Sequence, residues 1–122
     1  MSGHVEITEK RNGNIDIVTV KGRLDAGSSE TAQERINGGV LDAGGRNLLV
    51  NLCELDYISS SGLRVLLATL KRLKADGGGA LRIACAQPQI LEVFTMAGGF
   101  HRIFLLSPDE ATALAGFPAG GP

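Results

Sequence analysis

Apolar and charged residues alternate at the start of the chain and gather into apolar runs further along it. Residues 5–9 alternate as in a half-buried strand, and an Asn-Gly pair follows where a tight hairpin turn is favoured. Residues 15–20 are expected to return antiparallel to this first strand, and residues 22–25 to break the pattern. Residues 47–53 are mostly apolar, which is typical of a central strand covered on one or both faces. Residues 80–84 are predicted to form another buried strand.

Apolar residues at helical spacing separate these strands. The strongest pattern predicts a helix that starts near residue 63, carries basic residues on its other side, and stops at the glycines of 77–79. Its apolar positions are Leu63, Leu66, Leu67, Leu70 and Leu73. An earlier helix, capped by Ser28 or Ser29, is expected to end at the glycines of 38–39 or of 44–45.

Two further helices and a last strand complete the pattern. Pro88 suits the first turn of one helix, and residues 107–110 resemble the capped start of another that ends near Gly116. A short strand is predicted over residues 102–106. The order of elements implies an α/β fold with a mixed sheet, in which an antiparallel hairpin is followed by parallel strands joined by right-handed crossovers, with about four helices packed against it.

The chain length and composition fit one globular domain. Its 122 residues are 43% hydrophobic and 20% charged, close to the average of folded soluble proteins. We expect a domain over residues 1–116 and a disordered tail over 117–122, where Gly and Pro have nothing to pack against. The sequence has no leader pattern and no apolar run of about 20 residues, so a cytoplasmic protein without a membrane contact is expected.

The charges do not indicate a nucleic-acid partner. The 12 Lys and Arg residues balance 13 Asp and Glu residues, for a net charge of −1, and the basic residues are scattered along the chain. Proteins that track phosphates gather their basic residues on one face. We therefore expect no nucleic acid to bind.

Few residues in the sequence suggest catalysis or metal binding. Cys53 and Cys85 each lie inside an apolar run, which favours buried free thiols over a disulfide, and no Cys or His spacing indicates a metal site. His4 and His101 have no matched acid or nucleophile at a recognisable spacing. Two carboxylates, Glu54 and Asp56, could act as a pair, although a solvated acidic loop explains them equally well. We expect neither an enzyme nor a bound cofactor or metal.

A run of serines has a more informative position. A buried strand that leads through a short loop into a helix start surrounds Ser60 and Ser61 with unpaired backbone N–H groups and the positive end of the helix dipole. One of the serines could simply cap the helix. A phosphate added there would nevertheless meet donors that favour it.

The same residues resemble a known family. Residues 49–52 (Leu-Val-Asn-Leu) and 55–67 (Leu-Asp-Tyr-Ile-Ser-Ser-Ser-Gly-Leu-Arg-Val-Leu-Leu) closely resemble the signature of the STAS domain found in anti-sigma factor antagonists. Three further stretches, 22–25, 81–85 and 93–104, resemble the family in the right order. The likeness runs from about residue 4 to residue 115.

The resemblance implies a partner switch on a STAS-like mixed sheet. In this family the unphosphorylated antagonist binds a serine kinase of the ATP-binding type that doubles as an anti-sigma factor, which frees the sigma factor for transcription. The kinase then phosphorylates a loop serine of the antagonist, and a PP2C-like phosphatase restores it. Aligned on Gly62 and Leu63, the phosphorylated position is Ser60, with Ser61 and Ser59 as alternatives. Ser59 stands where the family has an acidic residue.

The resemblance also implies a contact surface around Ser60. Its expected members are Asp25, Ser28, Tyr57, Ile58, Ser59, Ser60, Ser61, Gly62, Leu63 and Arg64. Within this set Tyr57 could be a packing residue or an interface anchor, and Ile58 suits a core position. Two other functions stay open: a STAS scaffold that is never phosphorylated and binds a fixed partner such as a transporter component or a signalling complex, and a small-molecule or nucleotide sensor that uses loops at the carboxyl ends of the parallel strands.

Overall fold

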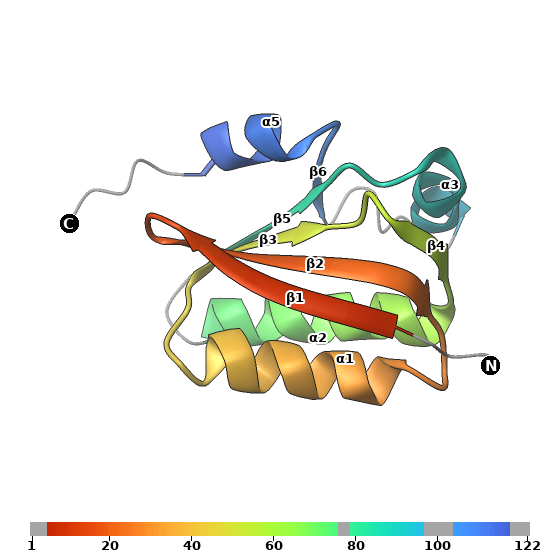
Figure 1. Ribbon diagram of the computed structural model, residues 1–122, viewed down its shortest axis with the longest axis horizontal. Coiled ribbons are helices and arrows are strands. Elements are labelled where there is room, and N and C mark those ends of the chain that lie inside the picture. Colours follow the sequence, from red (N-terminus) through yellow and green to blue (C-terminus); the bar gives the residue numbers. More distant parts are fainter. Residues whose placement is uncertain (1–4, 76–78, 97–103, 118–122) are drawn as a thin grey trace.

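A mixed β-sheet with helices on both faces forms the protein (Figure 1). The computed structural model describes residues 5–75, 79–96 and 104–117. Within these ranges the six strands are β1 (Val5–Asn12), β2 (Ile15–Leu24), β3 (Asn47–Asn51), β4 (Leu55–Ile58), β5 (Ala80–Ala84) and β6 (Leu105–Ser107). The sheet order is β1-β2-β3-β5-β6, and β4 pairs with the last part of β2.

The strand directions are those that the sequence predicts. β1 and β2 form an antiparallel hairpin, and the remaining pairs of neighbouring strands are parallel. Gly13 in the hairpin turn has a φ of +62°, in the left-handed region that glycine enters without steric cost. The α/β mixed sheet is therefore confirmed.

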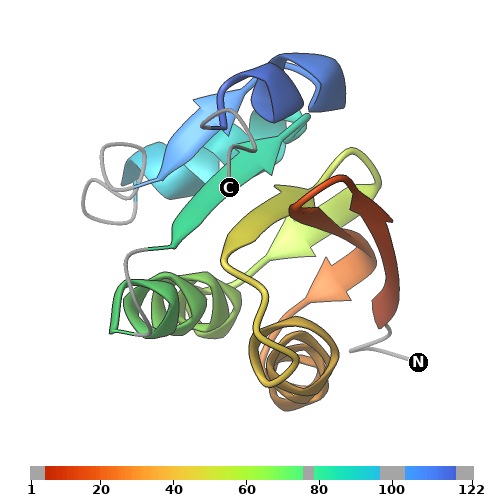
Figure 2. The same cartoon turned by 90° about the vertical axis from the view of Figure 1, so that its left-hand side faces the viewer.

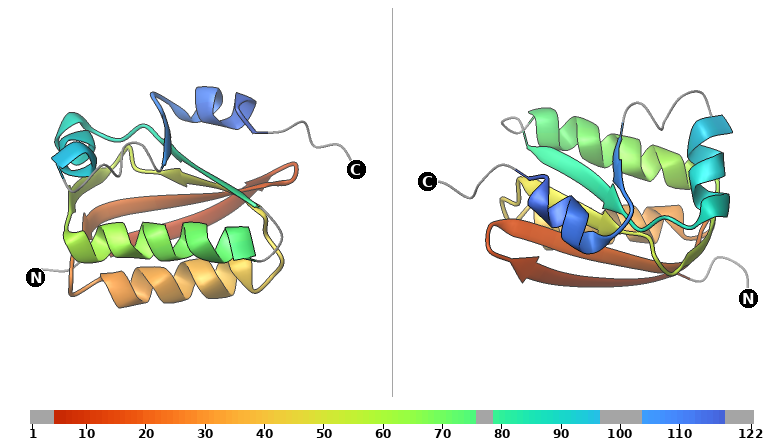
Figure 3. Two further views of the ribbon diagram at one scale, coloured as in Figure 1. Left: turned by 180° about the vertical axis from the view of Figure 1, so that it is seen from behind. Right: turned by 90° about the horizontal axis from the view of Figure 1, so that it is seen from above.

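In the part of the chain that the structure describes, four α-helices cover the sheet: α1 (Ser29–Ile36), α2 (Ser60–Ala75), α3 (Pro88–Met96) and α5 (Glu110–Ala115). Figure 2 shows α1 and α2 nearly end-on and side by side on one face of the sheet, with α5 on the other face. In both views of Figure 3, α3 lies beyond the end of the sheet, close to β4. α1 runs on into a π-helical turn, η1 (Asn37–Leu41), so the helical path passes the first glycine pair and ends at Leu41. The turn that follows contains Gly44, whose φ is +90°.

Each face of the sheet has its own hydrophobic core. The larger core lies between the sheet and α1, α2 and α3, and it includes an edge-to-face contact between the rings of Phe94 and Phe104 at 5.8 Å. α5 covers the smaller core, whose buried members are Ile15, Ile17, Leu49, Ala84, Ala113 and Phe117. Because Phe117 is only 7% exposed, the packed structure reaches one residue beyond the predicted end at residue 116. Residues 118–122 lie outside the described ranges.

Two features near β4 differ from the predictions. The pattern predicts a break at residues 22–25, but β2 continues through Leu24 with an irregularity between Gly22 and Arg23. Residues 55–58 are predicted as loop, but they form β4 alongside this last part of β2. A four-residue strand that pairs with only one neighbour carries too short a pattern to predict.

The last strand runs from Leu105 rather than over 102–106, and residues 102 and 103 lie outside the described ranges.

The prediction of buried free thiols is wrong. Cys53 and Cys85 form a disulfide, and each is partly exposed. β3 and β5 are neighbours in register, with Asn51 opposite Ala84, so the residues just past these strands meet at a Cα–Cα distance of 4.7 Å. A sequence spacing does not reveal which strands are neighbours, and for that reason the pair could not be predicted.

Asp109 caps α5 and gives this short helix a pH dependence. Its carboxylate accepts a hydrogen bond from the Thr112 backbone N–H at 2.7 Å, and this bond, with the Thr112 hydroxyl second, lowers the pKa of Asp109 below 3.8. Since the folded pKa is the depressed one, the cap stabilises the folded state above the unfolded pKa and is lost as pH falls through the folded value. We therefore expect the helical 13Cα NMR shifts of α5 to decline below pH 3.8.

A matched variant separates this cap from general acid effects. Asn caps helices about as well as Asp and does not titrate, so Asp109→Asn should keep the α5 shifts and lose their decline below pH 3.8. An equal decline in Asp109→Asn would assign the pH response to another group.

Candidate functional site

Ser59, Ser60 and Ser61 lie where β2 and β4 finish side by side and α1 and α2 begin (Figure 1, right). We call this end of the domain the serine end. Leu24 and Ile58 are the last partners of this strand pair. The Ser59 backbone N–H donates to the Leu24 carbonyl at 2.9 Å, which extends the pairing by one residue and fixes the chain just before α2. The sheet therefore sets the position of the α2 start.

The three serines have different roles at this helix start. Ser59 is the capping residue, because its Oγ accepts from the Gly62 N–H at 3.3 Å and its carbonyl accepts from the Leu63 N–H at 3.0 Å. Ser60 and Ser61 are the first two helical residues, so their N–H groups belong to the first turn that lacks intrahelical partners. The Ser60 side chain is exposed and that of Ser61 is half-buried. Neither hydroxyl makes a hydrogen bond within the described part of the chain.

Gly62 lets α2 pack closely on the end of β2. A Cβ at this position would lie 2.6 Å from the Leu24 carbonyl oxygen and 2.8 Å from a side-chain carbon of Ile58. Real Cβ contacts do not come this close, and the nearest of the two is backbone that is already bonded to Ser59. The serines are thus held against the sheet by a contact that only glycine permits.

Arg23 and Tyr57 form an exposed stacked pair beside the serines. The Arg23 guanidinium lies 4.3 Å from the centroid of the Tyr57 ring, and its Nε is 3.5 Å from a carboxylate oxygen of Asp25. Tyr57 is 41% exposed, so its ring is available at the surface. The set of site residues predicted from the sequence omits Arg23. Its neighbour Asp25 is in that set, but the register that places Arg23 opposite Tyr57 depends on β4, which the sequence does not reveal.

Ser28 holds the loop before α1. Its side chain is 1% exposed, its hydroxyl donates to the Arg23 carbonyl at 2.7 Å, and its Oγ accepts from the Asp25 N–H at 3.0 Å. It makes no side-chain cap to α1, although it occupies the N-cap position. Ser28 therefore fixes the backbone of Arg23 and Asp25 rather than the helix.

The predicted contact residues gather at this end but divide by burial. Those accessible at the surface are Asp25, Tyr57, Ser59, Ser60, Ser61 and Arg64. Ser28, Ile58, Gly62 and Leu63 are buried. These four shape the surface from below, and they offer a partner little area of their own.

The other candidates do not converge into a site. Glu54 pairs with Lys21 at 3.4 Å, and Asp56 is exposed on β4, so the two acids are not a matched pair. His4 and His101 lie outside the described residues. Among the residues that the structure describes, no three His, Cys, Asp or Glu side chains group as metal ligands, and no helix is long and apolar enough to cross a membrane.

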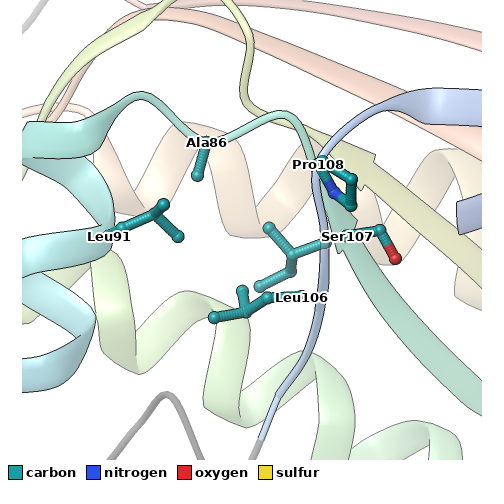
Figure 4. Close-up of a pocket in the computed structure, with 6 residues that line it drawn as sticks. Ala86, Leu91, Leu106, Ser107 and Pro108 are labelled. Carbon is teal, nitrogen blue, oxygen red and sulfur yellow. The ribbon is translucent and has the colours of Figure 1, made fainter. Parts of the chain in front are cut away.

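A pocket of about 330 Å³ lies between β5, α3 and β6 (Figure 4). Its lining residues are Ile83, Ala86, Leu91, Leu106, Ser107 and Pro108. The side chains of Ala86, Leu91 and Leu106 point into a common space in Figure 4. This lining is almost wholly apolar, contains no titratable group, and includes none of the residues around Ser60.

The chain is similar to known STAS domain proteins and anti-sigma factor antagonists. The STAS domain profile matches residues 6–113. BtrV of Bordetella bronchiseptica, provisionally named an anti-sigma factor antagonist, is 30% identical over 118 residues, which cover 97% of this chain and 99% of BtrV. A solved anti-sigma factor antagonist from Mycobacterium paratuberculosis has a TM-score of 0.81 at 21% identity, covering 94% of this chain and 95% of its own.

The Bacillus anti-sigma factor antagonist SpoIIAA has the same fold in two solved forms. The unphosphorylated form has a TM-score of 0.74 at 18% identity, covering 89% of this chain and 93% of its own. The phosphorylated form has a TM-score of 0.68 at 18% identity, covering 90% and 97%.

Proposed function

This chain belongs to the STAS domain family, among the anti-sigma factor antagonists, and from this premise we propose that it is a partner switch controlled by phosphorylation of Ser60. In its unphosphorylated form it binds an anti-sigma factor that is also an ATP-dependent serine kinase, and so frees a sigma factor. Phosphorylation of Ser60 releases the complex, and a PP2C-like phosphatase restores binding. The observation that carries the proposal is the exposed Ser60 hydroxyl on the first residue of α2, above unpaired backbone N–H groups.

The role of Ser59 supports Ser60 as the phosphorylated residue. Ser59 occupies the position of the family's acidic residue, and its Oγ is engaged with the Gly62 N–H. Asp and Ser are about equally good helix caps. The replacement therefore preserves a capping group before Ser60, while Ser60 keeps a hydroxyl that a kinase can reach.

We expect a phosphate on Ser60 to act on partner binding rather than on the fold. A phosphoserine carries roughly −1.5 to −2 charges at pH 7, and a helix N-terminus favours such charge by about 0.3–1 kcal/mol. The domain should therefore stay folded. A partner that fits a neutral hydroxyl would instead have to desolvate a dianion on a surface that already carries Asp25.

Tyr57 and Arg23 supply an anchor for the partner beside this serine. Tyr and Arg are enriched among the residues that dominate interface energetics, because each combines a large apolar area with a polar tip. Here the ring and the guanidinium are already stacked at 4.3 Å, so little side-chain freedom is left to lose on binding. The proposed contact surface is the accessible set Asp25, Tyr57, Ser59, Ser60, Ser61 and Arg64, extended by Arg23.

The switch implies a location and a chemical role for the chain. A sigma factor and the ATP that its regulator consumes are in the cytoplasm, so we place the protein there. The chain itself is the substrate of the kinase, not an enzyme, and the nucleotide belongs to its partner. No nucleic acid or membrane takes part in the switch.

The test is capture of the partner followed by addition of ATP. Tagged unphosphorylated protein and a tagged Ser60→Ala variant should both retain an ATP-binding kinase from a lysate of the host. On addition of Mg·ATP the wild-type complex should dissociate, while the Ser60→Ala complex persists. A wild-type complex that holds one partner irrespective of ATP would contradict the switch and support a fixed-partner scaffold.

A further inference from the structure

The Cys53–Cys85 disulfide joins the two segments that follow the central strands β3 and β5. The Leu52 N–H donates to the Ala84 carbonyl at 3.0 Å, so the backbones are paired up to the residue before each cysteine. The bond therefore lies at the carboxyl end of the parallel strands, where β4 begins. The chain has two cysteines, and both are in this bond.

This disulfide is accessible and is anchored on strained backbone. Both cysteines are partly exposed, which leaves part of each residue open to a small thiol. Cys85 has a φ of +63°, in the left-handed region that a residue with a side chain rarely adopts, and its N–H is held by the Ser107 carbonyl at 2.9 Å. Exposed or strained disulfides are those that exchange with thiols in solution.

Hydrogen bonds connect the disulfide to β4. The Gln87 side-chain amide, two residues after Cys85, donates to the carbonyls of Cys53 at 3.0 Å and of Leu55 at 3.1 Å. The Leu55 N–H in turn donates to the Leu52 carbonyl at 3.1 Å. Together with the disulfide, these bonds fasten the start of β4 to the segment after β5. β4 is four residues long, pairs with the end of β2 and leads directly into Ser59, so its attachment at this end adds to the order that the strand pairing gives it.

We propose that Cys53 and Cys85 are a reversible modification site for low-molecular-weight disulfides, and that their oxidation state sets the order of β4 and the serine end. One cysteine thiolate attacks the small disulfide and displaces a thiolate, which leaves a mixed disulfide on the protein. The second cysteine thiolate attacks that mixed disulfide, forms the Cys53–Cys85 bond and releases the other small thiolate. The two protons of the protein thiols end on the two small thiols, and two electrons pass from the protein to the small disulfide. Excess small thiol reverses both steps.

An effect on the switch follows, and this part rests on the proposed function. A cytoplasmic disulfide is usually transient, because the compartment keeps thiols reduced. An oxidised protein would hold β4, Tyr57 and the α2 start in the conformation described above. A reduced protein would present the same residues on a looser segment, and its partner would then have to order them on binding.

The experiment measures amide hydrogen exchange in the purified protein equilibrated with glutathione disulfide or with dithiothreitol. Reduction should speed exchange of the Leu55 and Ser59 amides at least tenfold, while the Ala113 amide in α5 changes less than twofold. A Cys53→Ser, Cys85→Ser double variant should exchange at the reduced rate in both buffers, since no other cysteine remains. The wild-type comparison stands alone if that variant fails to fold. Failure of the thiols to form the bond in glutathione disulfide, or equal exchange in both states, would overturn the proposal.

A second measurement separates this inference from the proposed function. The phosphorylation rate of Ser60 by the captured kinase should differ at least threefold between the oxidised and reduced proteins. Absence of phosphorylation in both states would contradict the proposed function and leave the exchange result as independent support for the redox site. Equal, measurable rates would overturn the effect on the switch.

Discussion

Ser60→Asp is expected to weaken binding of the protein to its kinase partner by about a hundredfold or more. The variant places a permanent carboxylate on an exposed helix start, beside a surface that already carries Asp25. A partner that fits a neutral hydroxyl must remove the water of this carboxylate without supplying an opposite charge of its own, and burial of a poorly paired charge costs several kcal/mol. Isothermal titration calorimetry with the captured kinase, in the absence of ATP, measures the loss.

Two control variants make this result specific. Ser60→Ala keeps a small neutral side chain and should bind within about threefold of the wild type, since the Ser60 hydroxyl makes no hydrogen bond within the described part of the chain. Both Ser60 variants should keep the thermal stability of the wild type, because the cap of α2 is Ser59. If Ser60→Asp and Ser60→Ala bound with equal affinity, Ser60 would not be part of the interface.

Gly62→Ala is expected to destabilise the fold by about 1–3 kcal/mol. In an open helical position this substitution would stabilise the protein, by about 0.5–1 kcal/mol, because alanine has the better helix propensity. Here the added Cβ would lie 2.6 Å from the Leu24 carbonyl oxygen, and that carbonyl also accepts from Ser59. The steric cost exceeds the gain in helix propensity, so the free energy of unfolding should fall.

Gly38→Ala supplies the matched control. Gly38 lies in the helical path after α1, and a Cβ there would meet nothing within 4 Å. We expect this change to be neutral or stabilising by a few tenths to about 1 kcal/mol in urea unfolding. If Gly62→Ala proved as stable as Gly38→Ala, close packing of α2 on β2 would not be what positions the serines.

The sequence predicts most of the fold because its strongest patterns are local. Leucines at helical spacing define α2. Of the five predicted apolar positions, Leu63, Leu66, Leu70 and Leu73 are buried and Leu67 is half-buried. The alternation of residues 5–9 and an Asn-Gly turn define the hairpin. These patterns depend on neighbours within a few residues, which a single sequence contains.

The differences arise where structure depends on segments far apart in the chain. β4 exists because the end of β2 pairs with it, and its four residues carry no pattern of their own. The Cys53–Cys85 bond exists because β3 and β5 are neighbours, which no spacing in the sequence states. The stacking of Arg23 on Tyr57 follows from the same missed strand.

The candidate site shows the same division. The helix start at the serine run can be predicted from the buried strand before it and the leucine spacing after it. Which serine caps the helix cannot, because three consecutive hydroxyls all suit that role. The geometry distinguishes them: Ser59 bonds the Gly62 N–H, Ser61 is half-buried, and Ser60 is exposed.

The central claim is that Ser60 carries the regulatory phosphate, and intact-mass and phosphopeptide spectrometry tests it most directly. The protein and a Ser60→Ala variant would be purified from their own host, both growing and stressed. We predict a mass increase of one phosphate group that changes with condition, maps to Ser60 and is absent from the variant. A protein that carries no phosphate under any condition, or one whose phosphate persists on Ser59 or Ser61 in the variant, would contradict the account.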